Sequence, residues 1–557
     1  MKSFLKKVLI FAAVMAVVAA AGWFGRKAYK RSAEHKLIAL ARQYEAQKDW
    51  HNTNLCLERV LQINPVSAEA YKMIADLLES TGSPSALIWR VRLAENEPDN
   101  VTNRLLWAQT AIKFQNLKSA EEALSKIDDQ TKKTAAYHKM AGALAWNLGQ
   151  PAEAENQYAE ALRLEPDNQA VLLNLESIRL TSTNQTVAAP ARLALESTIT
   201  NAALRPVALQ HLLTDALDRH NIPKAVAYST EIVRQPTATF SDKINHLQLL
   251  HVAKSDDYGP WLASLQAAAL HSPADAFALG RSLATTENPG TALRWLHELP
   301  LETQTNLPVP LIITDCQIAL KDWNGLLTFV NRQDWGEIEF YRLAVESLAQ
   351  RSLNHDDASQ TDWHKTLRLT AHHLDRLTRL ADVTRTWGWA PEQTEVLLQI
   401  TDEFPDEKWA VSQLMAQYYA DGKTGELQRL LLKSHTANPD DTRIENNLAN
   451  ILLLRKSELD QANLMAKQVY EASPSDPFFI STYAYSLFLQ KKPDEALKVL
   501  NNLKPEYLKI PSIAAYYGVI QAGSGHQALA REPIALADSA KLLPEEKEMV
   551  RLAKARL

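Results

Sequence analysis

The sequence is poor in glycine and has almost no cysteine. Only 16 of its 557 residues are Gly, under half of the roughly 7% that is usual. So little glycine argues against glycine-rich phosphate loops and against β architectures built from tight hairpins. The two cysteines, Cys56 and Cys316, are too few for a disulfide framework, a zinc knuckle or a C-x-x-C redox motif. We expect both to behave as small buried apolar residues.

Sequence motifs of catalysis are lacking as well. The chain contains no G-x-S-x-G nucleophile motif and no H-E-x-x-H zinc motif. Gly523-Ser524-Gly525 begins a loose G-x-G-x-x-A match, but no strand is expected before it. Gly422-Lys423-Thr424 lacks the upstream glycine of a phosphate loop, because Gln417 occupies that position. We therefore predict no enzymatic activity, no cofactor and no metal.

The charge of the chain is unevenly distributed. The first 31 residues contain seven basic residues and no acidic one, which leaves 53 basic against 65 acidic residues and a net charge of −12 in residues 32–557. Binding to nucleic acid depends on basic patches that neutralise phosphates. An acidic body therefore predicts no nucleic-acid partner.

One long apolar run stands near the N-terminus. Residues 8–25 are uncharged and mostly apolar, and these 18 residues would span about 27 Å as a helix, near the lower limit for crossing a bilayer. A cleaved signal peptide is one alternative, since Ala19-Ala20-Ala21 offers a cleavage site. Basic residues directly after the run favour an uncleaved anchor, and we assign residues 1–31 to a membrane anchor with basic flanks.

Basic residues flank the apolar run on both sides, so the positive-inside rule is nearly balanced. The lysine-rich start is similar to that of a signal-anchor. We expect a single-pass protein of the inner membrane whose body lies outside the cytoplasm, with the lipid bilayer contacted through residues 8–25.

The rest of the chain has the periodicity of helices. From about residue 34, apolar and small residues recur every three or four positions, in runs of roughly 12–15 that end at proline or short polar turns. Pro65 and Pro98 are 33 residues apart, and Pro439 and Pro474 are 35 apart. A period near 34 is typical of paired-helix repeats. The pattern predicts an all-α chain.

Within these repeats, small residues alternate with large apolar ones at fixed positions. The repeat from Glu34 has Leu37, Leu40, Ala41, Tyr44, Thr53, Leu57, Val60 and Pro65; the repeat from Ala135 has Ala141, Gly142, Ala145, Ala154, Tyr158, Ala161 and Pro166; the repeats from Pro477 and Pro511 have Ile480, Tyr483, Ala484, Leu487, Ala496, Leu500, Ala514, Tyr517, Gly518, Ala530 and Ile534. On these residues the chain resembles tetratricopeptide repeat (TPR) proteins of the membrane-anchored bacterial type. The resemblance implies a right-handed α-solenoid of antiparallel helix hairpins, preceded by one transmembrane helix.

The match to the repeat varies along the chain. We expect an N-terminal TPR array over residues 32–183, degenerate TPR-like repeats over 184–405, and a C-terminal array with a capping helix over 406–557. A separate domain in the middle is the alternative. The polar stretches 181–186 and 352–361 are predicted loops.

The resemblance also implies a binding surface, because the first helices of TPR hairpins line a concave groove. The residues that would face it in the C-terminal array form a polar and a partly aromatic stripe: Arg443, Asn446, Asn447, Asn450, Phe478, Tyr485 and Phe488. Asn side chains bond peptide backbones and aromatic rings anchor interfaces. The alternative is that the aromatic side chains pack between hairpins and the Asn stripe is only solvated. The dicarboxylate clamp of some TPR domains is not reproduced, because Ser412 and Ala416 stand where it needs Lys and Asn.

These observations predict a membrane-anchored TPR scaffold or adaptor that binds partner proteins on its concave surface, in envelope assembly, secretion or polymer export. One alternative is a self-associating membrane TPR homo-oligomer. The other, less favoured alternative is an enzyme whose site lies in the degenerate middle repeats.

Overall fold

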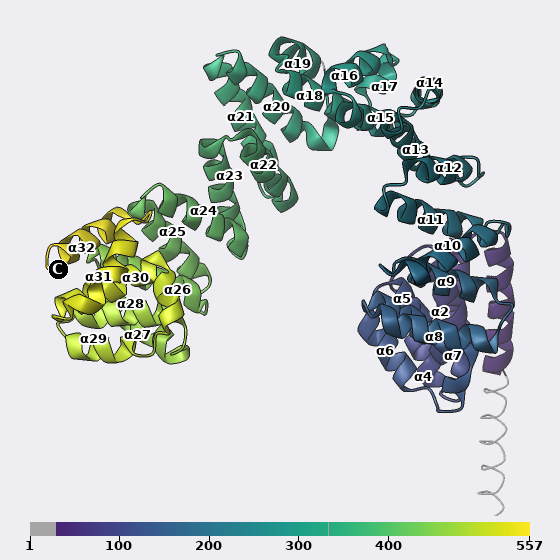
Figure 1. The fold of residues 1–557 in the computed structure, drawn as a ribbon, viewed down its shortest axis with the longest axis horizontal. Coiled ribbons are helices and arrows are strands. Elements are labelled where there is room, and N and C mark those ends of the chain that lie inside the picture. Colours follow the sequence, from purple (N-terminus) through teal and green to yellow (C-terminus); the bar gives the residue numbers. More distant parts are fainter. Residues whose placement is uncertain (1–28, 332) are drawn as a thin grey trace, which may run out of the picture. The chain divides into compact units, whose positions relative to one another are not determined.

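The computed structural model describes residues 29–331 and 333–557, and every regular element in this part of the chain is a helix (Figure 1). The chain divides into two compact units, Met1–Ser282 and Leu283–Leu557. Within the described residues, no helix is both long enough and apolar enough to cross a membrane. The predicted span at 8–25 lies outside the described residues.

Unit 1 is a succession of helices joined by short turns, with helical residues 29–46 at its start. Its further helices are α2 (Trp50–Ile63), α3 (Ala68–Ser80), α4 (Ala86–Asn96), α5 (Val101–Lys113), α6 (Leu117–Ser125), η1 (Thr131–Lys133), α7 (Ala135–Asn147), α8 (Pro151–Leu164), α9 (Gln169–Leu180), α10 (Gln185–Thr198), α11 (Arg205–Asp218), α12 (Ile222–Val233), α13 (Phe240–Val252) and α14 (Tyr258–Ala269). Helix α15 (Pro273–Thr286) crosses the division between the units.

Unit 2 continues in the same manner to the C-terminus. Its helices are α16 (Pro289–Glu298), α17 (Leu301–Thr305), α18 (Val309–Leu320), α19 (Trp323–Val330), η2 (Gly336–Ile338), α20 (Glu339–Ser352), α21 (Asp356–Thr370), α22 (Leu374–Trp387), α23 (Ala390–Glu403), α24 (Lys408–Ala420), α25 (Thr424–Ala437), α26 (Thr442–Arg455), α27 (Leu459–Ala472), α28 (Pro477–Leu489), α29 (Pro493–Leu500), η3 (Pro505–Lys509), α30 (Pro511–Gly523), α31 (Gln527–Asp538) and α32 (Pro544–Lys554). One hydrophobic core of buried residues runs from Ala344 to Ala553.

The small residues of the repeat pattern lie where the two helices of a hairpin cross. In several hairpins, one small residue of the first helix is followed 12 residues later by one of the second helix, and both are buried. These pairs are Ala41 and Thr53, Ala108 and Ala120, Gly142 and Ala154, Ala484 and Ala496, and Gly518 and Ala530. A Cβ on Gly142 would lie 2.9 Å from Tyr158 Cδ2, and one on Gly518 would lie 2.8 Å from Ile534 Cγ1. Close helix crossing is thus the physical basis of the pattern, and the TPR resemblance is confirmed at this level.

The turns inside the hairpins use left-handed residues to reverse the chain. Gly422 and Gly525 have φ of +68° and +85° and lie between consecutive helices, so the Gly422-Lys423-Thr424 and Gly523-Ser524-Gly525 motifs lie at helix–helix turns. Where glycine is absent, other residues adopt this conformation: Lys321 has φ of 56° and is followed by Asp322, whose side chain accepts from the N–H of Gly325 and caps α19. In this turn a lysine takes the left-handed position that glycine usually occupies, and the aspartate after it caps the next helix.

One predicted loop is much shorter than expected. Residues 352–361 are polar, but only 353–355 connect α20 to α21, and helix α21 begins at Asp356. Two adjacent aspartates at the start of a helix are stabilised by the helix dipole, so a polar sequence is compatible with helix here. At 181–186, residues 181–184 form the connection and Gln185 already begins α10.

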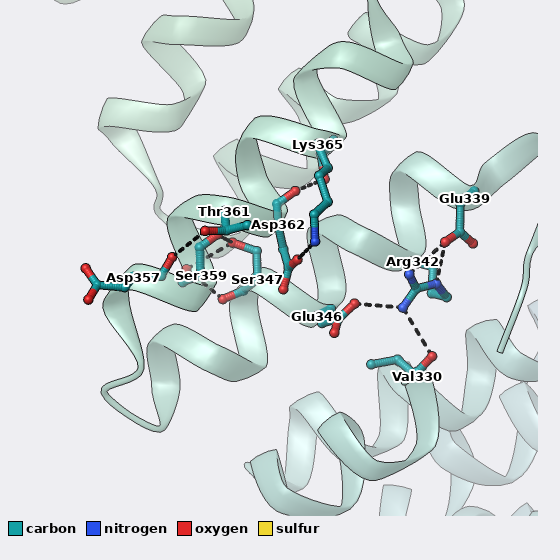
Figure 2. Close-up of polar contacts among 11 residues, drawn as sticks. Val330, Glu339, Arg342, Glu346, Ser347, Asp357, Ser359, Thr361, Asp362 and Lys365 are labelled. Atoms are coloured by element: carbon teal, nitrogen blue, oxygen red, sulfur yellow. Dashed lines mark hydrogen bonds and ion pairs between the residues drawn. The ribbon is translucent and has the colours of Figure 1, made fainter. Parts of the chain in front are cut away.

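In the middle repeats the same crossing is made with polar residues. Ser347 of α20 and Ser359 of α21 are both buried and are spaced by 12 residues (Figure 2). The Ser347 hydroxyl donates to the Ser359 carbonyl at 2.8 Å, and the Ser359 hydroxyl donates to the Ser347 carbonyl at 2.9 Å. The reciprocal bonds satisfy both hydroxyls where other hairpins bury alanine or glycine.

A buried arginine links the same hairpin to the helix before it. Arg342 forms ion pairs with Glu339 and Glu346, and its guanidinium also donates to the carbonyl of Val330 at the end of α19 (Figure 2). The charge is therefore paired and hydrogen-bonded despite 8% exposure. We assign this cluster a structural role.

Candidate functional site

The candidate binding surface is a groove between the first helices of two consecutive hairpins in unit 2, which we call the α24–α26 groove. It has a volume of about 670 Å³. Helix α24 forms one wall, α26 the other and α25 the floor. The lining residues are Pro405, Lys408, Val411, Ser412, Met415, Ala416, Tyr419, Leu427, Leu431, Ser434, Asn438, Asp441, Arg443, Ile444, Asn447, Asn450 and Ile451.

Three of the predicted binding residues lie together on the α26 wall. Arg443, Asn447 and Asn450 follow one another at intervals of four and three residues, so they share one face of the helix. Among the described residues, the Arg443 guanidinium has no ion pair and the Asn447 amide no hydrogen bond. The single O–H hydrogen of Tyr516 is shared between Asn450 Oδ1 at 3.0 Å and Glu546 Oε1 at 3.2 Å, and the NH₂ group of Asn450 has no hydrogen bond among the described residues. The wall therefore offers a row of unused donors above an apolar floor.

At one end of the groove, the charge of Lys408 is already paired with that of Asp441. Lys408 Nζ lies 2.7 Å from Asp441 Oδ2. The hydrogen bond from Lys408 is the main cause that lowers the pKa of Asp441 below its usual range, and the backbone N–H groups of Ile444 and Arg443 add to it. Asp441 thus caps α26 and pairs Lys408, so among the described residues that line the groove Arg443 is the charged one without an ion pair.

The other four predicted residues do not line this groove. Asn446 is buried and its Oδ1 has no hydrogen-bond partner among the described residues. Phe478 is about half exposed, at 47%. Tyr485 is buried with its ring centroid 5.1 Å from that of Tyr516, and Phe488 lies against Gly523 of α30. The predicted polar and aromatic stripes therefore lie in different surroundings.

The surroundings of Tyr485 and Phe488 are formed by the last helix of the chain. With Leu454 and Val519 they face Met549 and Leu552 of α32 across a cavity of about 490 Å³. Helix α32 also contacts α26 and α30. The surface that the repeat pattern assigns to ligand binding is, in these hairpins, occupied by the chain itself.

A buried carboxylate fixes α32 on that surface. Glu546 is 2% exposed. Its Oε2 accepts from the Tyr419 hydroxyl at 2.6 Å and from the Leu543 N–H at 2.9 Å, and its Oε1 accepts from the Tyr516 hydroxyl at 3.2 Å. Next to it, the Thr424 hydroxyl donates to Glu545 at 2.6 Å. One glutamate thus connects α24, α30 and α32.

Burial has the largest effect on the pKa values of Glu546, Tyr516 and Tyr419. Burial raises the pKa of Glu546 above its usual range, against the opposing effect of hydrogen bonds from Tyr419, Leu543 and Tyr516. Burial and the nearby Glu546 carboxylate raise the pKa of Tyr516 and that of Tyr419 well above 10. Both tyrosines are therefore hydrogen-bond donors at any physiological pH.

Sequence reasoning missed Tyr419, Tyr516 and Glu546. A signal for the glutamate exists, because Glu546, Met549, Val550 and Ala553 follow the i, i+3, i+4, i+7 spacing of one helix face and all four are buried. A charged residue inside an apolar stripe indicates a buried partner. Nothing in the sequence indicates that the partners come from α24 and α30.

The middle repeats contain one pair that is similar to a catalytic dyad. The Ser229 hydroxyl and His246 Nδ1 are 2.7 Å apart, and the His246 ring meets Trp261 edge to face at 5.0 Å. Ser229 is 2% and His246 5% exposed, so a substrate has no access to either side chain in this structure. Burial lowers the pKa of His246. We assign this pair to packing between α12 and α13.

No protein-family model matches this chain, and no curated protein matches it either. Solved structures with similarity include PilF of Pseudomonas aeruginosa (16% identity, TM-score 0.31, 38% of this chain and 96% of that one), the Naa15/Naa10 complex bound to HypK (15%, 0.30, 94% and 79%), and the APC/C hetero-tetramer Cut9-Hcn1 (13%, 0.29, 92% and 98%). At such low scores, the TPR-like assignment rests on the helix hairpins and the buried small residues described above.

Proposed function

We propose that this chain is a helical-repeat scaffold that binds another polypeptide in the α24–α26 groove. The observation that carries the proposal is the row of unused donors on Arg443, Asn447 and Asn450 above an apolar floor. An extended peptide presents carbonyl oxygens at regular intervals, which asparagine amides bond well. Its apolar side chains would contact Met415, Leu427 and Ile451 on the floor and walls.

The groove can be tested with a random 12-residue peptide library displayed on phage and selected against the full chain in detergent. Enriched peptides are then measured against the Arg443→Ala/Asn447→Ala double variant. We expect at least a tenfold loss of affinity, about 1.4 kcal/mol, for the loss of one charge-assisted and one neutral hydrogen bond. Arg429→Ala is the control, because Arg429 is exposed on α25 and does not line the groove. Equal affinity for the double variant would contradict the proposal.

We further propose that residues 8–25 anchor this scaffold in the inner membrane, with the body outside the cytoplasm. The support is the sequence: an uncharged apolar run flanked by basic residues, with lysines at the start. A role in envelope assembly, secretion or polymer export follows from such a location. Fusing a periplasm-active and a cytoplasm-active reporter to Leu557 tests it. Activity from the cytoplasmic reporter alone would reverse the orientation and move the search for partners to cytosolic complexes.

A further inference from the structure

Helix α32 lies on an unexpected surface for a terminal cap. A cap that only continued the stack would contact α30 and α31. Helix α32 instead also reaches α24 through Glu546, contacts α26, and faces Tyr485 and Phe488 of α28. Together with α30, these are the first helices of four consecutive hairpins. In the part of the chain that the structure describes, α32 therefore lies across the first helices of several hairpins, where the repeat pattern places a ligand.

The contact has the composition of a recognition site. A polar centre is formed by Tyr419, Tyr516 and Glu546, and an apolar part by Met549 and Val550. Burying a carboxylate is costly unless it is well bonded, and an apolar residue in its place would satisfy a purely structural cap. Two tyrosine hydroxyls from different hairpins supply the bonds. The surface thus selects a glutamate at one position of the helix.

The attachment of α32 is confined to one face of the helix, which packs against α30, α31 and α26. Five residues, 539–543, join it to α31, and two of them, Leu542 and Leu543, are buried in the same core. The outward side of α32 is charged, with Lys547 and Arg551 exposed. Only one stripe, of Glu546, Met549, Val550 and Ala553, is buried. A short helix held by one stripe opens at a lower free energy than the core helices beneath it.

We propose that the inner surface of α24, α26, α28 and α30 is a helix-binding site that reads a glutamate, and that α32 is its resident ligand. A partner helix with an acidic residue followed by apolar residues three, four and seven positions later replaces it. Two residues of this site, Tyr419 and Asn450, also line the α24–α26 groove, so exchange of the helix alters one end of that groove. The inference extends the proposed function, but its test needs no groove ligand.

The test uses a fluorescent synthetic peptide of residues 540–557 and the full chain. Val550→Asp places a charge on the buried stripe of α32 and releases that helix without changing the surface beneath it. We expect the peptide to bind this variant at least tenfold more tightly than wild type, where α32 competes. Adding Tyr419→Phe and Tyr516→Phe, or using a peptide with Glu546→Ala, should weaken binding about tenfold. Lys547→Ala is the control variant, because Lys547 is exposed.

Hydrogen exchange on the wild-type chain keeps the proposal testable should Val550→Asp fail to fold. We expect the amides of α32 to exchange at least tenfold faster than those of α26 and α28, and excess peptide to speed their exchange further. If the amides of α32 exchanged at the same rate as those of α30, and the peptide did not change that rate, α32 would be a permanent part of the fold. That result would overturn the proposal. A concentration-dependent dimer that the peptide dissociates would also overturn it, by assigning the site to α32 of a second copy.

Discussion

The Tyr419 hydroxyl donates a hydrogen bond to the Glu546 carboxylate, although 127 residues separate them. Repeat arrays are held together mainly by contacts between neighbouring repeats. This bond therefore connects two hairpins that the repeat pattern alone would leave apart. It places the last helix on the inner faces of the first helices of four hairpins and makes Glu546 the residue whose substitution is most informative.

Glu546→Ala should destabilise α32 by about 1–3 kcal/mol, because it leaves the hydroxyls of Tyr419 and Tyr516 buried without their acceptor. Glu546→Gln keeps an acceptor oxygen and should cost less. Hydrogen exchange of the α32 amides measures both. Lys547→Ala serves as the control on the exposed side and should change the opening free energy by less than about 0.5 kcal/mol. Equal effects of the Ala and Gln variants would show that the hydroxyls do not depend on this carboxylate.

The docking of α32 should weaken as pH rises. The pKa of Glu546 is raised in the folded chain, so the folded state holds its proton more tightly than the open state does. The stabilisation is complete below the open-state value, about 4.3, and is lost as pH rises through the folded-state pKa. After correction for intrinsic exchange, α32 should open more easily at pH 7.5 than at pH 5. Glu546→Gln should flatten this profile, and an unchanged slope in that variant would assign it to other groups.

The crossing of α20 and α21 should accept alanine but no larger side chain. Replacing both Ser347 and Ser359 by Ala removes donors and acceptors together, so we expect unfolding free energy within about 1 kcal/mol of wild type. Ser347→Leu should cost about 1–3 kcal/mol or more, because that position is fully buried at a close helix crossing. Urea unfolding followed by circular dichroism compares them. Thr361→Ala on the exposed side of α21 is the control (Figure 2). If Ser347→Leu were as stable as Thr361→Ala, the two helices would not cross closely at Ser347.

Two glycines of unit 2 should respond in opposite directions to alanine. A Cβ on Gly518 would lie 2.8 Å from Ile534 Cγ1 and 3.2 Å from its backbone nitrogen, so Gly518→Ala should destabilise by about 1–3 kcal/mol. Gly425 is the second residue of α25 and has nothing within 4 Å of its Cβ position, so Gly425→Ala should stabilise slightly, by up to about 0.5 kcal/mol. The shift of the urea midpoint gives both signs. A neutral Gly518→Ala would mean that α30 and α31 can move apart.

Some of the predicted site residues are placed by local helical spacing, and others depend on a distant part of the chain. Arg443, Asn447 and Asn450 line the groove because helical spacing places them on one face, which sequence alone reveals. Their role in binding stays a prediction. The cover over Tyr485 and Phe488 was not predictable, because it depends on where α32 returns. The middle repeats were hard to detect because Ser347 and Ser359 replace the small apolar residues that mark the pattern elsewhere.

The sequence by itself determined that the chain is helical, that its helices pair in hairpins of about 34 residues, and that small residues mark their crossings. These features depend on helical periodicity, on proline and capping residues at turns, and on the space available between neighbouring helices, all of which are local. Only the tertiary structure decided which inner faces stay open and which ones α32 covers. That outcome depends on Tyr419, Tyr516 and Glu546 meeting across long stretches of chain, and no local pattern encodes such a meeting.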